Sequence, residues 1–234
     1  MGKPEFYKAL HQHQLYSQAL EACGLSLTIL EADPDYPDGL FVEDVAVLTD
    51  QACILANPGA ASRLGEKELL RPLLTTLFDQ VFEITAPGTL DGGDICQADD
   101  HFFIGLSERT NLEGASQLAW FLQVLGFQAS TIDLHGFPGL LHLKSGLAYL
   151  GEGNLIMVPE LEGLEVFSAY QRLLVTSQES YAANCLRVND TVLLADGFPG
   201  IRKTLEKAGY RLAILDVSEF QKMDGGLSCL SLRF

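Results

Sequence analysis

Short apolar runs occur along the chain in pairs, and each pair is divided by a tight polar turn. Such a pair predicts a β-hairpin, and Asn189-Asp190 between the last two runs favours a two-residue loop. The pairs recur at intervals of roughly 40 to 50 residues, a period typical of propellers and similar closed arrays. The paired runs are Val45–Leu48 with Ala52–Leu55, Ile95–Cys96 with Phe102–Ile104, Leu147–Leu150 with Leu155–Val158, and Cys185–Val188 with Thr191–Leu194.

Between the hairpins, apolar residues recur about every 3.6 positions, which predicts amphipathic helices. These helices are expected over Pro4–Cys23, Arg109–Gly126 and Pro199–Gly209. A strand is expected after each of them, over Leu25–Leu30, Gln128–Leu134 and Tyr210–Leu215. The repeating unit is therefore hairpin, helix, strand, and the fold class is α/β rather than all-β.

The two ends of the chain do not complete this repeat. No hairpin precedes the first helix, and the last apolar run, Leu227–Leu232, has no partner run after it. A closed ring would pair that run with a strand before Pro4, so we expect an N-terminal strand to be missing. The terminal strand should then be unpaired on one side or paired with another chain. If it is fully paired, Lys3–Tyr7 is the first candidate for its partner. Residues 1–234 are expected to form a single catalytic domain.

The charge balance narrows the class of partner. The chain has 31 acidic and 15 basic residues, a net charge of −16, and no basic stripe, which argues against nucleic acid. An acidic chain can instead attract a cationic small molecule. No apolar run approaches the ~20 residues needed to cross a bilayer, and the N-terminus lacks the apolar segment of a secretory signal. We therefore expect a cytoplasmic protein with no membrane partner.

The cysteines are an odd set with no Cys-x-x-Cys pair and no zinc-binding spacing. They are Cys23, Cys53, Cys96, Cys185 and Cys229. In the cytoplasm such thiols stay reduced, so neither a disulfide nor a metal site is predicted. Taken alone, Cys229 on an apolar run would be interpreted as a buried, inert thiol.

Polar, often glycine-rich corners lie before the hairpins and the terminal run. These corners are Phe41–Asp44, Leu90–Asp94, His142–Gly146, Ala182–Cys185 and Asp224–Cys229. Each is weak by itself, because Asp-Gly-Gly is usually a turn and an isolated histidine is more often structural than catalytic. In a ring of repeats, however, equivalent corners converge on one central pocket, and their recurrence favours a functional site.

These corners lie within longer stretches that resemble the dimethylargininases, the dimethylarginine dimethylaminohydrolases of the guanidino-group-modifying (pentein) superfamily. The stretches are Phe41–Asp44, Ala86–Asp94, Gly105–Asn111, Leu141–Leu150, Ser180–Cys185 and Met223–Phe234, and the similarity covers essentially the whole chain. The resemblance implies a five-unit α/β-propeller, a pseudo-fivefold ring of ββαβ modules. It also implies a cysteine hydrolase that converts N(G)-methylated arginine to L-citrulline and dimethylamine or methylamine through a covalent thiouronium intermediate, with no organic cofactor.

By the same resemblance, Cys229 is the nucleophile, His142 the general acid/base, and Asp91 the carboxylate that orients the histidine, where some relatives carry Glu. The chemistry fits these residue types. A guanidinium carbon is a poor electrophile, and a thiolate whose pKa is lowered by a neighbouring cation can attack it. A histidine can protonate the leaving amine and then deprotonate the water that resolves the intermediate.

The resemblance also implies a set of substrate-binding residues. Glu43 and Asp44 surround the guanidinium, Asp38 and Phe41 flank the same pocket, Arg63 and Arg109 lie around the amino-acid end, and the Met223 carbonyl accepts from the substrate amine. Carboxylates suit the first role because they bind guanidinium in bidentate geometry and fix its plane for attack.

Two alternatives remain open. One is a deiminase of the same superfamily that acts on unmethylated arginine or agmatine, because the same triad serves both reactions. The other is a truncated, weakly active or non-catalytic ligand-binding member, because relatives carry a longer N-terminal segment with a first strand and a loop over the substrate. The oligomeric state is also open, with a homodimer as one alternative.

Overall fold

The structure is a computed structural model that describes residues 2–234. The chain divides into two compact units, each with its own sheets. Unit 1 comprises residues 2–31 and 146–228, and unit 2 comprises residues 32–145 and 229–234. The expectation of a single catalytic domain over residues 1–234 stays a prediction.

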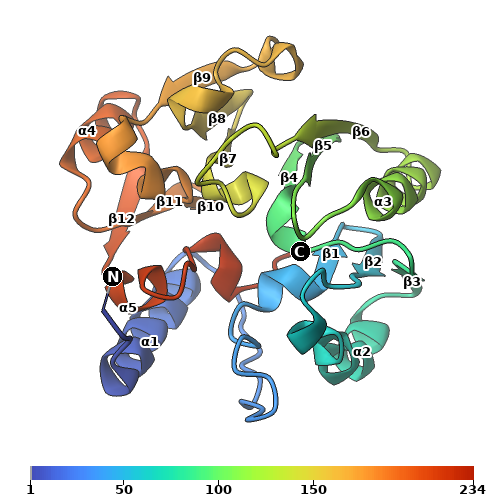
Figure 1. Cartoon of the computed structure of the whole chain (residues 1–234). Coiled ribbons are helices and arrows are strands. Elements are labelled where there is room, and N and C mark those ends of the chain that lie inside the picture. Colours follow the sequence, from blue (N-terminus) through green and yellow to red (C-terminus); the bar gives the residue numbers. More distant parts are fainter. Residues whose placement is uncertain (1) are drawn as a thin grey trace. The chain divides into compact units, whose positions relative to one another are not determined.

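Every sheet repeats one pattern: an antiparallel hairpin followed by a third strand that pairs in parallel with the second (Figure 1). The sheets of unit 2 are β1 (Ala46–Leu48), β2 (Ala52–Leu55) and β3 (Gln80–Glu83), and β4 (Ile95–Ala98), β5 (His101–Leu106) and β6 (Gln128–Asp133). Those of unit 1 are β7 (Leu147–Gly151), β8 (Asn154–Met157) and β9 (Gln171–Leu174), and β10 (Leu186–Val188), β11 (Thr191–Ala195) and β12 (Arg211–Leu215). The four predicted hairpins are confirmed.

The last hairpin shows how the local sequence sets its turn. Val188 pairs with Thr191, so the loop consists of Asn189 and Asp190 alone, as predicted. Asn189 has a φ of 53°, a left-handed conformation that asparagine tolerates better than most residues.

Parallel pairing requires a crossover connection, and for most of the third strands that connection contains an α-helix. The helices are α1 (Phe6–Ala22), α2 (Glu66–Leu77), α3 (Leu112–Val124), α4 (Pro199–Lys207) and α5 (Ser218–Gln221). The predictions of α1, α3 and α4, and of the strands β6 and β12, are confirmed. In α3, Asn111 caps the first turn by accepting from the Gly114 N–H at 2.8 Å, and Gly126, with a φ of 89°, follows the last turn.

Two sheets contain elements that the pattern did not predict. Helix α2 and strand β3 were missed, and α2 carries Pro72 in its interior, which obscures a helical pattern. Strand β9 was missed as well. Two 3₁₀ helices, Pro159–Leu161 and Glu165–Phe167, connect it to β8 in place of an α-helix.

Two strand predictions at the ends of the repeat are wrong. Leu25–Leu30 is irregular, and Ile29 is 68% exposed, so its apolar alternation does not mark a buried strand face. Within Leu227–Leu232, residues Ser228–Leu230 form a 3₁₀ helix. The Ser228 N–H donates to the Asn184 side chain at 3.0 Å rather than to a neighbouring strand. Lys3–Tyr7 supplies no closing strand either, because α1 begins at Phe6.

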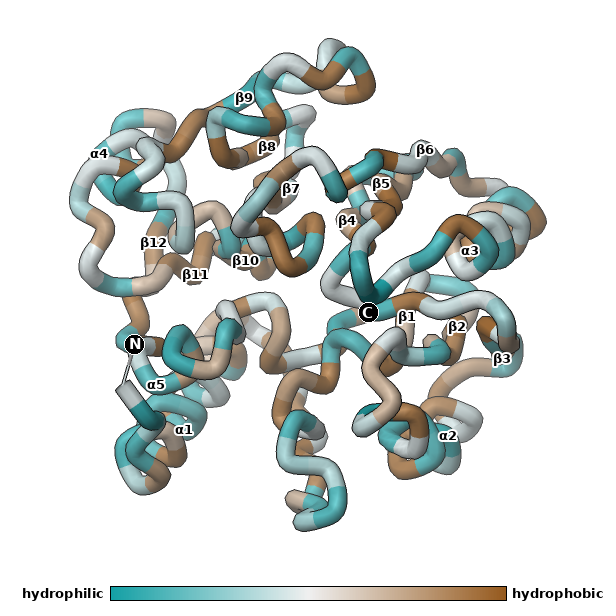
Figure 2. Tube along the Cα trace, in the orientation of Figure 1, coloured by the Kyte–Doolittle hydropathy of each residue, from teal (hydrophilic) through white to brown (hydrophobic). Residues whose placement is uncertain are grey.

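Unit 2 buries its strands in two apolar clusters that fix the corners beside them. One cluster joins the two sheets of the unit to helix α3 through Ile54, Phe102 and Leu118. The other packs Leu74 of α2 against β1 and β2, with Leu232 of the C-terminal segment beside it. Helix α1 of unit 1 differs from these apolar clusters, because hydrophilic and hydrophobic residues alternate along its length (Figure 2).

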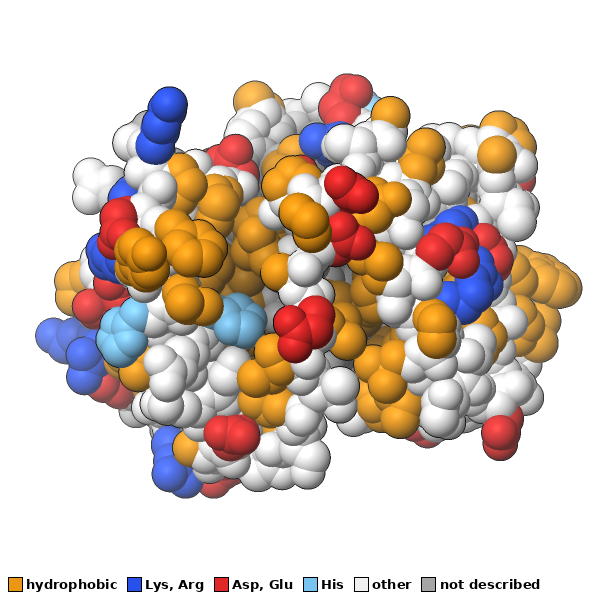
Figure 3. Space-filling view, turned by 90° about the horizontal axis from the view of Figure 1, so that it is seen from below, with side chains coloured by type: hydrophobic (Ala, Val, Ile, Leu, Met, Phe, Trp, Pro, Cys, Tyr) orange, Lys and Arg blue, Asp and Glu red, His pale blue; other side chains and the backbone are white. Residues whose placement is uncertain are grey.

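Apolar side chains are also exposed on the described surface. They include Phe6, Tyr7 and Leu10 of α1 and Trp120 and Val124 of α3. On the face drawn in Figure 3, such side chains lie among separated acidic and basic groups. None of the helices in residues 2–234 is both long and apolar enough to span a membrane.

Candidate active site

The predicted site residues are distributed unevenly between the units. Unit 2 contains Asp38, Phe41, Glu43, Asp44, Arg63, Asp91, Arg109, His142 and Cys229. Met223 alone falls in unit 1, in the turn after α5, where its N–H donates to the Phe220 carbonyl at 2.9 Å. The structure therefore brings the predicted catalytic residues and most of the predicted binding residues into one unit.

The first corner is a 3₁₀ helix, Val42–Val45, which leads directly into β1 and buries two adjacent carboxylates. Asp44 is 4% exposed and accepts two hydrogen bonds, from Arg63 Nη1 at 2.6 Å and from the Gly93 N–H at 2.8 Å. The glycine is needed for this approach, because a Cβ at position 93 would lie 2.8 Å from both Asp44 Oδ1 and His142 Nδ1. Asp44 is thus oriented from two sides.

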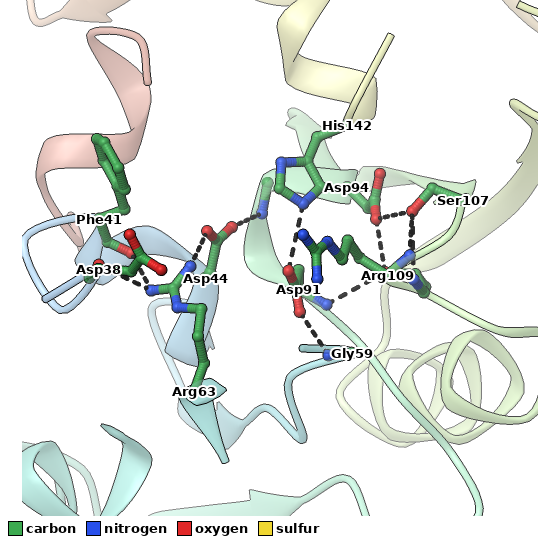
Figure 4. A network of polar contacts seen from close by, with 12 residues as sticks. Asp38, Phe41, Asp44, Gly59, Arg63, Asp91, Asp94, Ser107, Arg109 and His142 are labelled. Atoms are coloured by element: carbon green, nitrogen blue, oxygen red, sulfur yellow. Dashed lines mark hydrogen bonds and ion pairs between the residues drawn. The ribbon is translucent and has the colours of Figure 1, made fainter. Parts of the chain in front are cut away.

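Arg63 is buried, and its guanidinium is committed to other residues of unit 2 (Figure 4). It pairs with Asp44 and with Glu66, whose Oε2 lies 2.6 Å from Nη2. The same Nη2 donates to the backbone carbonyls of Asp38 at 3.2 Å and Phe41 at 3.0 Å. A buried charge requires such compensation. Arg63 therefore orients Asp44 and ties down the segment that carries the predicted pocket residues.

Glu43, the neighbouring carboxylate, is 3% exposed and faces two cations. Its Oε1 lies 2.7 Å from Lys144 Nζ and 3.1 Å from Arg233 Nη2. Lys144 stands two residues after His142, and Arg233 belongs to the same C-terminal segment as Cys229. Sequence reasoning missed both cations. The position of Lys144 within the histidine corner could have indicated it, whereas no sequence signal points to Arg233.

His142 and Asp91 form the predicted pair, with 3.3 Å between Nε2 and Oδ2. Both are buried, at 8% and 1% exposure. Asp91 is held in turn, because its Oδ1 accepts from the Gly59 N–H at 2.9 Å and its own N–H donates to Thr110 Oγ1 at 3.1 Å. A carboxylate fixed in this way can set the orientation and tautomer of the imidazole.

The surrounding charges determine the protonation of His142. Burial opposes the imidazolium, but the hydrogen bond to Asp91 and the charges of Asp44, Asp94 and Asp91 outweigh it. Together they raise the pKa of His142 to about 9. The side chain is therefore a proton donor at neutral pH, which suits the protonation of a leaving amine.

Cys229 lies in the middle of the short 3₁₀ helix Ser228–Leu230 and is half-buried. Other thiols of the chain contrast with it. Cys53 is fully buried, and burial raises its pKa to about 12 although the charge of Arg71 opposes the shift. A thiol held neutral in this way is a poor nucleophile, so the structure favours Cys229 over Cys53 as the reactive thiol.

Arg109 differs from Arg63 in its exposure and its partners. It is half-buried, and its backbone N–H donates to Ser107 Oγ at 3.0 Å. Within residues 2–234, the Arg109 guanidinium forms no ion pair, so its charge is available to an anionic group.

The polar atoms of Asp44, Asp91 and His142 lie within 4.8 Å of one another, which is close enough for a metal ion. Both Asp44 oxygens, however, already accept hydrogen bonds, from Arg63 and from the Gly93 N–H. Metal binding also needs a neutral imidazole, which the raised pKa of His142 disfavours. Asp44, Asp91 and His142 therefore suit a hydrogen-bonded acid/base cluster better than a metal site.

The fold and the side chains together define a class, the carbon–nitrogen hydrolases built on an α/β-propeller (pentein) fold. The family model described as "N,N dimethylarginine dimethylhydrolase, eukaryotic" matches residues 5–161. The chain is 42% identical over 235 residues to the N(G),N(G)-dimethylarginine dimethylaminohydrolase of Pseudomonas aeruginosa, covering 100% of this chain and 91% of that protein. It is 34% identical over 227 residues to the Streptomyces coelicolor enzyme of that name, covering 96% and 85%. The chain therefore belongs to the dimethylarginine dimethylaminohydrolase family.

Solved structures confirm the predicted fold class. A cysteine-to-serine variant of the Pseudomonas aeruginosa enzyme, complexed with citrulline, matches with a TM-score of 0.96 and 42% identity, covering 100% of this chain and 91% of that one. The N-terminal domain of ArgZ, a cyanobacterial arginine dihydrolase bound to its substrate, matches with a TM-score of 0.90. At 18% identity, over 98% of this chain and 88% of that one, this second match shows a shared fold alone.

Proposed function

We propose that the chain hydrolyses N(G)-methylated arginine, either asymmetric dimethylarginine or monomethylarginine, to L-citrulline and the corresponding methylamine. The observation that carries the proposal is the buried hydrogen bond of 3.3 Å between His142 and Asp91, in the same unit as Cys229. Membership of the family, at 42% identity to the Pseudomonas aeruginosa enzyme, supports the substrate class.

In this mechanism the Cys229 thiolate attacks the guanidinium carbon, and a carbon–sulfur bond forms. Collapse of the tetrahedral adduct breaks the bond from carbon to the methylated nitrogen, and His142 gives its proton to the departing amine. The remaining thiouronium is attacked by water, whose proton returns to His142. The carbon–sulfur bond then breaks and the hydroxyl of the adduct gives its proton to solvent, which releases citrulline and restores the thiolate. No oxidant or cofactor is needed.

The binding roles follow the charges of the site. Glu43 and Asp44 are adjacent carboxylates that suit the planar guanidinium, and Asp38 and Phe41 flank it. Their contact with the substrate stays a prediction, because Glu43 is already paired with Lys144 and Arg233, and Asp44 with Arg63. Arg109, whose guanidinium forms no ion pair within residues 2–234, suits the substrate carboxylate. For Arg63, contact with the amino-acid end of the substrate stays a prediction, because the guanidinium is already paired with Asp44 and Glu66.

Three further assignments belong to the proposal. The Met223 carbonyl accepts from the substrate amine. The protein acts in the cytoplasm, in line with its five free cysteines. A homodimer remains an alternative to a monomer, supported by the exposed Phe6, Tyr7 and Leu10 on α1.

The proposal is tested by measuring citrulline formed from asymmetric dimethylarginine, monomethylarginine and arginine. We expect turnover of the two methylated substrates and its loss in Cys229→Ser, with the fold retained. Cys23→Ser, which alters another partly exposed thiol, is the matched control and should keep wild-type activity. A preference for arginine would indicate the deiminase alternative, and near-wild-type turnover by Cys229→Ser would exclude Cys229 as nucleophile.

A further inference from the structure

Asp94 is the second carboxylate of the Leu90–Asp94 corner, and the proposed reaction gives it no part. The residue is fully buried, with 0% exposure. Its Oδ2 accepts from the hydroxyls of Ser107 at 2.6 Å and Thr110 at 2.7 Å, and its Oδ1 accepts from the Leu143 N–H at 3.0 Å (Figure 4). No lysine or arginine of residues 2–234 forms an ion pair with it. Burying a carboxylate without a paired lysine or arginine costs free energy, so we expect this side chain to have a specific role.

The directions of these hydrogen bonds indicate that Asp94 is ionised. A hydroxyl carries one proton. Ser107 Oγ already accepts from two backbone N–H groups, so its own proton is directed to Asp94. Thr110 Oγ1 accepts from the Asp91 N–H and also donates to Asp94. With the Leu143 N–H, three donors therefore point at Asp94, which suits an ionised carboxylate, because a proton on its carboxyl group would have to displace one of them.

The same contacts connect Asp94 to both partners of the catalytic pair. Leu143 directly follows His142, so the bond from its N–H fixes the backbone that carries the imidazole. Thr110 bridges from Asp94 to the Asp91 N–H, which fixes the backbone that carries the orienting carboxylate. One buried side chain thus sets the positions of the two groups that meet at 3.3 Å.

The charges around His142 indicate a second effect. The imidazole is influenced by Asp91 and Asp94 from the Leu90–Asp94 corner and by Asp44 from the Val42–Val45 helix. Asp44 is balanced by its ion pair with Arg63, whereas Asp94 has no such partner. Burial raises the pKa of Asp94, and the charge of His142 is the first of the effects that oppose this shift. The negative charge of Asp94 and the positive charge of the His142 imidazolium therefore stabilise each other.

We propose that Asp94 is a positioning residue of the reaction: an ionised carboxylate that holds His142 and Asp91 in register and keeps the proton on His142. The inference rests on the acid/base role proposed for His142. It differs from a purely structural role, because a neutral hydrogen-bonding group at position 94 would support the backbone without influencing the ionisation of the imidazole.

The test is an NMR titration of histidine ring carbons in the full-length protein, wild type against Asp94→Asn. Removal of a nearby negative charge disfavours the imidazolium, so the titration midpoint of His142 should fall by about one pH unit. The high-pH limb of kcat/KM should move the same way, with kcat lowered at least about tenfold and KM changed less. Asp133→Asn, which removes an exposed carboxylate paired with His135, is the matched control and should leave His142 unmoved.

A second variant covers the case in which Asp94→Asn does not fold. Ser107→Ala with Thr110→Val removes two of the three donors, so Asp94 should take up a proton and the His142 midpoint should again fall. A folded variant of either kind with an unmoved His142 midpoint would overturn the inference. This readout needs no turnover, so it stays separate from the test of the proposed function. If Cys229→Ser is inactive but the titration midpoint of His142 is unchanged in Asp94→Asn, the proposed function stands and the positioning role of Asp94 is rejected.

Discussion

Single residues of the site are distinguished by how each buried charge is compensated. Asp44 is paired with Arg63, Glu43 with Lys144, and Asp91 with His142, all inside unit 2. Loss of one partner would leave the other charge buried and unpaired, which costs several kcal/mol. An exposed ion pair such as that of Arg202 and Glu206 on α4 contributes at most about 1 kcal/mol. Substitutions that remove a charge at the site should therefore lower the free energy of unfolding more than substitutions that remove a charge on the surface.

The raised pKa of His142 predicts the pH dependence of the reaction. The leaving amine takes its proton from His142, which is protonated below its pKa of about 9. Activity that depends on this proton is present below that pH and is lost as the pH rises through about 9. We expect kcat/KM for citrulline formation to fall on this limb, whereas an unshifted histidine would give a fall near pH 6.5. A limb near pH 6.5 would show that the three carboxylates do not hold the proton.

Arg109 offers a separate test of the binding roles. In Arg109→Ala, loss of a charge-assisted contact of about 1.5–3 kcal/mol should raise KM for dimethylarginine about 10- to 150-fold. Agmatine derivatives lack the carboxylate, so kcat/KM for them should not change. The ratio of kcat/KM for arginine derivatives to that for agmatine derivatives should therefore become smaller. Arg202→Ala removes an exposed arginine of α4 and serves as the control. An unchanged preference for arginine derivatives would assign the carboxylate to another group.

Secondary-structure elements could be predicted from the sequence most completely where their cause is local. The turn at Asn189 and the helix α3, which follows the Asn111 cap, depend on residues close in sequence, and both were predicted correctly. Leu227–Leu232 has a strand-like composition but no strand partner, so its backbone adopts a 3₁₀ turn held by Asn184. Strand pairing is a non-local property, and composition alone does not supply it.

The segment that leads into Cys229 is fixed by one neighbouring element of unit 1. Asn184 donates to Ser228 Oγ and accepts from the Ser228 N–H, both at 3.0 Å, and the Tyr181 hydroxyl donates to the Gly225 carbonyl at 2.8 Å. Both residues belong to the Ser180–Cys185 stretch that the family resemblance had included without a role. The turn from Gly225 to Ser228, which directly precedes Cys229, is therefore held by hydrogen bonds at both of its ends.

Asn184→Ala tests this arrangement. The substitution leaves the buried Ser228 N–H without its side-chain acceptor, which should lower the free energy of unfolding by about 1–3 kcal/mol. It should also lower kcat more than it raises KM, because the thiol loses its fixed approach. Thermal unfolding and citrulline kinetics measure the two effects. Tyr181→Phe removes the hydroxyl that donates to the Gly225 carbonyl and should lie between wild type and Asn184→Ala. Wild-type kcat in a destabilised Asn184→Ala would limit the residue to a structural role.

At the scale of the whole molecule, the site is assembled from residues far apart in the sequence. Asp91 and His142 are separated by 51 positions, and Glu43 and Arg233 by 190. Hydrophobic periodicity predicts the repeating module but cannot pair such residues. The family resemblance named the first pair, while the Arg233 contact became visible only in the folded chain. The acidic net charge of −16 is consistent with a cationic substrate without identifying it.

In the proposed reaction Cys229 attacks the substrate carbon and His142 completes the hydrolysis. We would measure this by mass spectrometry of His142→Gln incubated with S-methyl-L-thiocitrulline, an analogue whose thiol leaving group departs without a proton from His142. Without the base that activates water the variant should not turn over, and the covalent adduct should accumulate. We expect one adduct per chain, located by peptide mapping on Cys229 and absent from Cys229→Ser. An adduct on another cysteine, or wild-type turnover by His142→Gln, would contradict the account.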